Sequence, residues 1–303
     1  MLTYNITETD HCRSTESFLG ALLPAAPLAY LKKLVRSGHL ALNGTQLSRD
    51  AILRLGDTLT LKESGRTKSF LSGKRPPLDI LYEDGWIIVF NKAPGLPMHR
   101  AAEVDERNMV ELGGMLLANR DGFAGKLRPV NRLDRGTSGA VLLAKSPTAA
   151  GMFGRFVKEE GLAKVYLAVV QGVLPEEGMI TEPLEGKEAV TSFRRLLQGD
   201  GMALAAVYPV TGRMHQIRQH FQGIGHPICG DKRYGGGILP EYEGILLHSF
   251  RTTFNHPATG ENVTVFAPLP AGFLAFLKEL AGEGYLSLMQ VLPEISGDYP
   301  KSA

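Results

Sequence analysis

Apolar side chains recur along the N-terminal 40 residues at the spacing of a helix. The positions that recur near a period of 3.6 are Leu19, Leu22, Leu23, Ala26, Tyr30, Leu31, Leu34 and Val35. They predict two helices within residues 12–37, separated by a turn at Pro24 and Pro27 and ended by Gly38. Residues 39–42 then read as a short strand, and the Asn43-Gly44 pair after it is typical of a tight hairpin turn.

The rest of the chain mixes strand and helix patterns. Apolar or alternating runs predict strands at 87–91, 140–144, 164–171, 203–208 and 263–266. Helical spacing predicts helices at 109–118, 148–158, 214–221 and 271–281. Strands and helices do not alternate strictly, and short turns that contain glycine join several strands. This order favours an α+β fold in which helices flank a mixed, largely antiparallel β-sheet.

These patterns divide the chain into four segments. Residues 1–62 predict a small α/β domain, and residues 63–77 are polar with Gly and Pro, which is typical of a linker. Residues 78–285 hold the large α+β domain, and residues 286–303 predict a polar, loosely held tail. We expect the protein to be a monomer.

Bulk composition excludes some protein classes. Hydrophobic residues make up 44% and charged residues 21% of the chain, as in ordinary globular proteins. No apolar run approaches the roughly 20 residues that span a bilayer, and the N-terminus lacks a basic-then-apolar leader, so we expect a cytoplasmic protein with no membrane partner. Cys12 and Cys229 are far apart in sequence, which fits a reducing compartment and argues against a zinc site.

Charge is distributed unevenly along the chain. The formal net charge is only +2, yet residues 1–75 hold 11 Lys and Arg against 6 Asp and Glu. A basic segment attached to a slightly acidic body indicates a small polyanion-binding module, although a solvated basic face would give the same count.

One carboxylate and two guanidiniums crowd the turn before the predicted strand at 140–144. Charges at the mouth of a buried strand are costly unless they are paired or used. Arg132 and Arg135 should keep Asp134 ionised at neutral pH. An ionised carboxylate acts as a nucleophile or base rather than as an acid. The alternative is that Asp134 only caps the turn through a local hydrogen bond.

A second charged group lies beside an apolar helix face. Arg218 follows the stripe formed by Met214, Ile217 and Phe221. A guanidinium pressed toward a core needs a carboxylate, and Asp134 is the strongest candidate, whereas the alternative is that Arg218 reaches water. Tyr166 lies on the predicted strand at 164–171, where a tyrosine is commonly a core residue.

The N-terminal segment resembles the S4-type RNA-binding domain. The resemblance rests on LVRSG at 34–38, LNG at 42–44 and GD at 56–57. It implies RNA contact through a basic helix face, with Lys32, Lys33 and Arg36 as candidates. Phosphate contacts of this kind add salt-dependent affinity and little sequence readout.

Six short motif groups, in this order, resemble those of the RluA-type pseudouridine synthases. They are LYED at 81–84 with NKAPGL at 91–96 and His99; RLDR at 132–135 with TSG at 137–139; KVY at 164–166; TGR at 211–213 with HQIR at 215–218; GHPI at 225–228 with GD at 230–231; and LH at 247–248. Each motif is short, but six in register are specific. The resemblance covers roughly residues 80–270.

The resemblance implies an isomerase that converts uridine in RNA to pseudouridine on the fold predicted above. It implies Asp134 as the catalytic aspartate, Tyr166 stacked on the target base and Arg218 paired with the aspartate. Arg135 would fill the space left by the extruded nucleotide. The residues expected to contact RNA in this domain are Arg132, Arg135, Arg213 and His215. The family commonly has His at Asn131, Thr or Ser at Met214 and an acidic or polar residue at Gly136, and these departures could alter RNA docking or target choice.

The implied reaction breaks the N1–C1′ bond, rotates the base and rejoins it through C5. It involves no redox change, so it requires no cofactor or metal, and the sequence has no nucleotide-binding loop or metal-ligand cluster. The base must first leave its stack at a cost of a few kcal/mol. Asp134 could attack C1′ or C6 or remove the ribose 2′ proton, and Tyr166 could accept the C5 proton. We expect ribosomal RNA rather than transfer RNA as the substrate.

Two other functions remain open on the sequence. A non-catalytic RNA-binding protein could share the fold, although it would need none of Asp134, Tyr166 and Arg218. A hydrolase that cleaves an N-glycosidic bond would need a second carboxylate as its acid. Asp231 is the motif-borne candidate, but Gly230-Asp231 is more typical of a turn.

Overall fold

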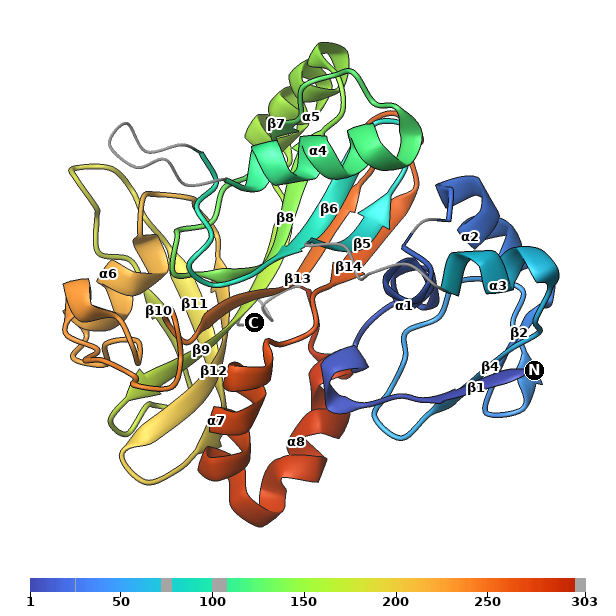
Figure 1. Cartoon of the computed structure of the whole chain (residues 1–303). Coiled ribbons are helices and arrows are strands. Elements are labelled where there is room, and N and C mark those ends of the chain that lie inside the picture. The colour runs from blue at the N-terminus through green and yellow to red at the C-terminus, as the bar shows by residue number, and fades with distance from the viewer. Residues whose placement is uncertain (25, 72–77, 100–107, 298–303) are drawn as a thin grey trace.

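The computed structural model describes residues 1–24, 26–71, 78–99 and 108–297 and contains two β-sheets (Figure 1). The smaller sheet lies in the N-terminal segment. Its strands are β1 (Leu2–Asn5), β4 (Thr58–Leu61), β2 (Leu40–Leu42) and β3 (Thr45–Gln46), in that spatial order and all antiparallel. Asn43 and Gly44 both have positive φ, as the tight turn between β2 and β3 requires.

Two helices cover the small sheet, as the apolar spacing predicts. They are α1 (Thr15–Leu22) and α2 (Leu28–Arg36). The Ser14 side chain accepts a hydrogen bond from the Ser17 amide and caps α1. Apolar residues of both helices and of the strands form one buried core, which we call the head core. A short 3₁₀ helix, η1 (Glu8–Asp10), connects β1 to α1.

The linker expected at 63–77 is partly helical. The helix α3 (Gly65–Leu71) follows β4, and its Phe70 and Leu71 pack against the head core. The Tyr30 hydroxyl hydrogen-bonds the buried Thr67 hydroxyl at 2.8 Å. The prediction weighed the polar composition of this segment and missed its single apolar face. Residues 72–77 lie outside the described residues.

The larger sheet has ten strands and is mixed but largely antiparallel, as predicted. Its main path runs β10 (Glu177–Ile180), β11 (Thr191–Gln198), β12 (Met202–Pro209), β9 (Ala163–Gln171), β13 (Leu247–Asn255), β8 (Ser138–Ala144), β6 (Ile87–Lys92) and β5 (Asp79–Glu83). The strands β14 (Asn262–Phe266) and β7 (Arg128–Pro129) pair with β13 and β8. Only the β8–β13 pair among these strands is parallel, and it joins the two halves of the sheet.

Helices cover both faces of this sheet (Figure 1). On one face, α4 (Met109–Asp121) and α6 (Gln216–Gly223) share a core with Val141, Leu143 and Tyr166. On the opposite face, α5 (Pro147–Glu159) packs on Ala140 and Leu142, and α7 (Ala271–Ala281) with α8 (Tyr285–Val291) packs on β9 and β12. Alternate residues of β8 therefore enter different cores, as strand geometry dictates.

The tail expected at 286–303 is largely helical. The helix α8 and the 3₁₀ turns η3 (Gly282–Gly284) and η4 (Leu292–Glu294) extend the body, with Leu288, Met289, Leu292 and Ile295 buried. These four residues follow a helical spacing that the polar composition of the segment hides. Residues 298–303 lie outside the described residues.

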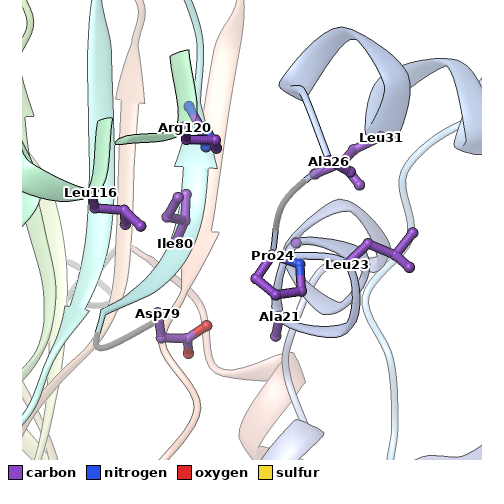
Figure 2. Close-up of a pocket in the computed structure, with 10 residues that line it drawn as sticks. Ala21, Leu23, Pro24, Ala26, Leu31, Asp79, Ile80, Leu116 and Arg120 are labelled. Carbon is purple, nitrogen blue, oxygen red and sulfur yellow. The ribbon is translucent and has the colours of Figure 1, made fainter. Parts of the chain in front are cut away.

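The N-terminal unit is docked on the body along β5 (Figure 1). Both terminal nitrogens of Arg13 donate to the Asp79 carboxylate, at 2.6 and 2.7 Å, and the Ser17 hydroxyl donates to the Ile80 carbonyl at 2.7 Å. A ring nitrogen of His11 lies 2.6 Å from the Met289 carbonyl oxygen. Figure 2 shows the small pocket at this junction, lined on one side by α1 and α2 and on the other by Asp79, Ile80, Leu116 and Arg120. The pocket lies between the two units and is not lined by the residues predicted for catalysis.

No helix in the described ranges combines the length and the apolar character that crossing a bilayer requires.

Candidate active site

Asp134 lies in the turn before β8, and a buried lysine fixes that turn to the neighbouring loop. Lys92, at the end of β6, is fully buried, and its Nζ donates to the carbonyl oxygens of Ala93, Leu96 and Arg135 at 3.0, 2.8 and 3.0 Å. Burial lowers the pKa of Lys92 to about 7, against the attraction of Asp134. The three bonds tie the residue after Asp134 to the loop at 93–96.

The first residues of β8 are anchored to β13 behind the turn. Gly139 has φ +108, and a Cβ there would lie 2.3 Å from the Ser249 carbonyl oxygen, so only glycine fits. The Ser138 hydroxyl hydrogen-bonds His248 Nδ1 at 2.8 Å, and His248 Nε2 lies 3.0 Å from the Ala267 carbonyl oxygen. Burial lowers the pKa of His248 to about 4, so the ring is neutral.

The helix α6 brings the second group of polar residues to Asp134. It begins at Gln216, because His215 before it adopts the left-handed conformation with φ 53° and ψ 23°. The prediction that Met214 opens a buried helical stripe is therefore wrong. Met214 precedes the helix and is 58% exposed, and the buried stripe begins at Ile217.

Arg218 is shared between two carboxylates. Its Nη1 donates to Asp134 Oδ2 at 2.9 Å, while Nε and Nη2 donate to the two oxygens of Asp231 at 2.6 and 2.9 Å. The exposed fractions of the side chains are 27% for Asp134, 11% for Arg218 and 1% for Asp231. Although burial opposes the charge, the two carboxylates raise the pKa of Arg218 above its usual value. Asp231 therefore fixes the guanidinium, and the remaining nitrogen is directed at Asp134.

The described ion-pair partners of Asp134 come from the α6 region rather than from its sequence neighbours. Arg132 is exposed, and Arg135 donates its Nε to the Gly95 carbonyl oxygen at 2.9 Å. Asp134 instead forms an ion pair with Arg218, the pairing that the sequence also proposed. No described backbone amide donates to the Asp134 side chain, so the alternative role of a turn cap receives no support.

Tyr166 lies on β9 in the face that α6 covers. It is 7% exposed, and burial raises its pKa to about 12, with the charge of Asp134 acting in the same direction. The phenol is therefore neutral and close enough to Asp134 for the two groups to interact. The ring contributes to the core on this face of the sheet.

A second tyrosine and a histidine complete the cluster. The Tyr234 hydroxyl lies 3.0 Å from His215 Nδ1, and the Arg218 guanidinium lies over the Tyr234 ring, 5.0 Å from its centroid. His215 Nε2 lies 3.7 Å from Asp134 Oδ1. Burial lowers the pKa of His215. His215, which the sequence places among the RNA-binding candidates, thus lies next to the Asp134 carboxylate.

The remaining RNA-binding candidates lie outside this cluster. Arg213 is exposed and donates its Nε to the Glu188 carbonyl oxygen at 2.8 Å. Lys33 and Arg36 are exposed on α2 and line a shallow surface depression with Lys32. The Lys32 Nζ also lies 6.0 Å from the centroid of the Tyr82 ring of β5.

Sequence reasoning missed three members of the site. Asp231 was interpreted as a turn residue or a second acid, and Tyr234 and Lys92 were given no separate role. A signal for Asp231 was available, since a carboxylate two residues after the apolar pair Ile228 and Cys229 needs a cation if it is buried. Nothing in the local pattern around Tyr234 indicates its contact with Arg218.

The cluster supplies a carboxylate that reaches the surface, a fixed guanidinium, a neutral imidazole and a neutral phenol. Such a set can perform nucleophilic and acid–base chemistry on a polar substrate. Within the described residues, no three His, Cys, Asp or Glu side chains gather in a way that would hold a metal ion.

The chain is similar to known proteins over nearly its whole length. The family model for RNA pseudouridylate synthase matches residues 86–223. The uncharacterized RNA pseudouridine synthase YjbO of Bacillus subtilis (strain 168) is 34% identical over 257 residues, which are 80% of this chain and 90% of the relative. The ribosomal large subunit pseudouridine synthase C of Escherichia coli (strain K12) is 29% identical over 308 residues, which are 91% of this chain and 95% of the relative.

Solved structures of pseudouridylate synthases are also similar to this chain. The human RNA Pseudouridylate Synthase Domain Containing 1 has 27% sequence identity and a TM-score of 0.53, and the match covers 69% of this chain and 88% of the human one. The segment matched by the family model includes Asp134, Tyr166 and Arg218, whereas Asp231 and Tyr234 follow it.

Proposed function

The chain belongs to the RNA pseudouridine synthase family and is an isomerase that acts on RNA, and from this premise we propose that Asp134 converts uridines of structured ribosomal RNA to pseudouridine. The observation that carries the assignment to Asp134 is its pairing with Arg218, whose other nitrogens are held by the buried Asp231. This arrangement orients one carboxylate at a surface-accessible position.

The geometry supports a nucleophile or base rather than an acid. Arg218 binds Asp134 through Oδ2, and no described residue donates a hydrogen bond to Oδ1. Oδ1 is then the oxygen that reacts with the substrate, either at the sugar or base carbon or with the ribose 2′ proton. An adjacent guanidinium stabilises the anionic form throughout.

A hydrolase with two catalytic carboxylates is disfavoured by the same contacts. An acid partner needs a protonated oxygen directed at the leaving group. Both oxygens of Asp231 accept hydrogen bonds from Arg218, and the side chain is 1% exposed. Asp231 therefore positions Arg218 and does not face a substrate.

RNA must present its uridine outside the base stack for Asp134 to reach it. We assign Tyr166 as the aromatic group against which the extruded base lies, because it is a neutral ring whose pKa is affected by the charge of Asp134. Arg135, exposed in the turn next to Asp134, is positioned to occupy the space that the base leaves. Arg132 and Arg213 are exposed and can contact phosphates nearby.

The N-terminal residues 1–62 are proposed to act as an S4-like RNA-binding domain. Lys33 and Arg36 are exposed on one side of α2, and Lys32 borders the same depression. These residues offer charge rather than base-specific contacts, so they supply affinity while the large domain selects the uridine. Ribosomal RNA is the proposed substrate because relatives that match almost the whole chain are named ribosomal large subunit pseudouridine synthases.

Replacement of Asp134 by Asn tests the proposal. The variant removes the reactive oxyanion but leaves the basic surfaces intact, so pseudouridine formation should fall on the order of 10⁴-fold or more while RNA binding persists. Nucleoside analysis of ribosomal RNA incubated with each protein measures the product. Asp200→Asn, at an exposed turn between β11 and β12, is the matched control. Equal product from wild type and Asp134→Asn would overturn the assignment.

A further inference from the structure

The two oxygens of Asp134 have different surroundings. Oδ2 accepts the hydrogen bond from Arg218 at 2.9 Å, whereas the nearest charged or titratable partner of Oδ1 is His215 Nε2 at 3.7 Å. That separation is too long for a hydrogen bond. The two atoms are nevertheless close enough for one substrate nucleotide to contact both.

The ring of His215 is held in this orientation by two features. Its backbone is left-handed, with φ 53°, at the residue before α6. Its Nδ1 lies 3.0 Å from the Tyr234 hydroxyl, and the two rings meet edge to face with centroids 5.7 Å apart. Tyr234 is itself covered by two guanidiniums, those of Arg218 at 5.0 Å and Arg233 at 5.6 Å. The imidazole is therefore a fixed part of the site.

We propose that His215 is a catalytic residue that accepts the proton released from C5 of the rotated uracil, with Tyr234 as its positioning residue. The inference rests on the proposed function. Once C5 has bonded to C1′, it carries both that bond and its original hydrogen. The C5–H electrons form the C5–C6 double bond, the proton passes to His215 Nε2, and the electrons of the N1–C6 double bond move to N1. N1 then takes a proton, either from the imidazolium or from water, so the reaction is a net proton transfer from C5 to N1.

Other groups near Asp134 suit this step less well. The Tyr166 phenol is neutral, with its pKa raised by burial to about 12, so it is a poor proton acceptor near neutral pH. Arg218 is cationic, and its nitrogens are occupied by Asp134 and Asp231. His215 is the group whose neutral form has a nitrogen lone pair available when Nδ1–H donates to the Tyr234 oxygen.

Burial favours the neutral ring of His215, and the charges around it act in both directions. Burial lowers its pKa most, Arg218 and Arg233 act in the same direction, and Asp134 and Asp231 oppose them. The Tyr234 hydroxyl contacts the ring at Nδ1. A neutral imidazole can accept a proton at pH 7, and it loses that ability when the solution is acidic enough to protonate it.

His215→Asn tests the proposal, because Asn tolerates the left-handed backbone better than most residues. The variant should lose about 100-fold or more of the turnover on RNA that contains uridine. It should also show a larger rate difference than wild type between substrates with hydrogen and with deuterium at C5, since proton removal becomes the slow step. Added imidazole should restore part of the turnover. Tyr234→Phe should show a smaller version of both effects.

Gln222→Ala, on the exposed side of α6, serves as the control and should behave as wild type in both measurements. Pseudouridine formed by the wild-type protein tests the proposed function separately. Failure of that function can therefore be distinguished from failure of the role proposed for His215. A folded His215→Asn protein with wild-type turnover overturns the proposal. A His215→Asn protein with reduced turnover also overturns the proposal if its C5 isotope effect matches that of wild type and added imidazole does not restore turnover. An increased isotope effect with imidazole rescue supports it.

Discussion

Removal of Asp231 should affect both stability and turnover, although Asp231 does not face the substrate. In Asp231→Ala, Arg218 loses two charge-assisted hydrogen bonds of 2.6 and 2.9 Å. Hydrogen bonds to charged groups contribute about 1.5–3 kcal/mol each, and breaking a buried pair costs about 3–5 kcal/mol. Arg218 keeps Asp134 as a partner and is 11% exposed, so the lower end, about 3 kcal/mol of unfolding free energy, is expected.

The same substitution should reduce turnover. Without Asp231, Arg218 loses two of the three hydrogen bonds that orient its guanidinium, so the nitrogen that binds Asp134 Oδ2 is held less firmly. A misplacement of about 1 Å near a reacting group can cost about 100-fold in rate. We therefore expect kcat on uridine-containing RNA to fall by about that factor, with a small change in KM, because the basic RNA-binding surfaces are unchanged.

Urea denaturation followed by circular dichroism, together with turnover measurements, tests this reasoning. A loss of about 3 kcal/mol should lower the unfolding midpoint by about 1 M urea or more. The control is Asp200→Ala, which removes an exposed carboxylate. In the double variant Asp231→Ala with Arg218→Met, no guanidinium is left partly unpaired, so the midpoint should recover while activity stays low. An Asp231→Ala protein as stable and as active as wild type would refute the role of Asp231.

Two other predictions concern regions away from the reactive carboxylate. His248 is neutral in the folded protein, with a pKa of about 4, whereas an unfolded histidine titrates near pH 6.5. Its contribution to the free energy of unfolding is therefore complete above pH 6.5 and is lost, by about 3 kcal/mol, as the pH falls toward 4. His248→Gln should therefore lose less unfolding free energy than wild type between pH 7 and pH 4, and equal losses would contradict this. Lys33→Gln with Arg36→Gln should weaken RNA binding and reduce the slope of log affinity against log salt by about 1 for each phosphate contact removed, as measured by titration at several salt concentrations. An unchanged slope would show that α2 does not contact the RNA backbone.

Most of the secondary structure could be predicted from the local sequence pattern. Apolar runs of strand length and helical spacing predicted β8, β9, α5 and α7 nearly at their observed bounds, because the length and spacing of apolar positions depend on the local backbone geometry of each element. The pairing of Asp134 with Arg218 was also predicted, since a buried guanidinium and a charged turn each require a partner. For residues 63–77 and 286–303, the sequence predicted a linker and a loosely held tail because the composition of these segments obscured the apolar faces of α3 and α8.

Tertiary structure decided which of these charged residues share a site. Asp134 and Asp231 are far apart in sequence, and only the parallel pairing of β8 with β13 and the packing of α6 bring both to Arg218. The left-handed backbone of His215 and its contact with Tyr234 likewise depend on two loops meeting. Local patterns record whether a side chain is buried, but not which distant group it meets, because that choice follows from strand order and register across the whole sheet.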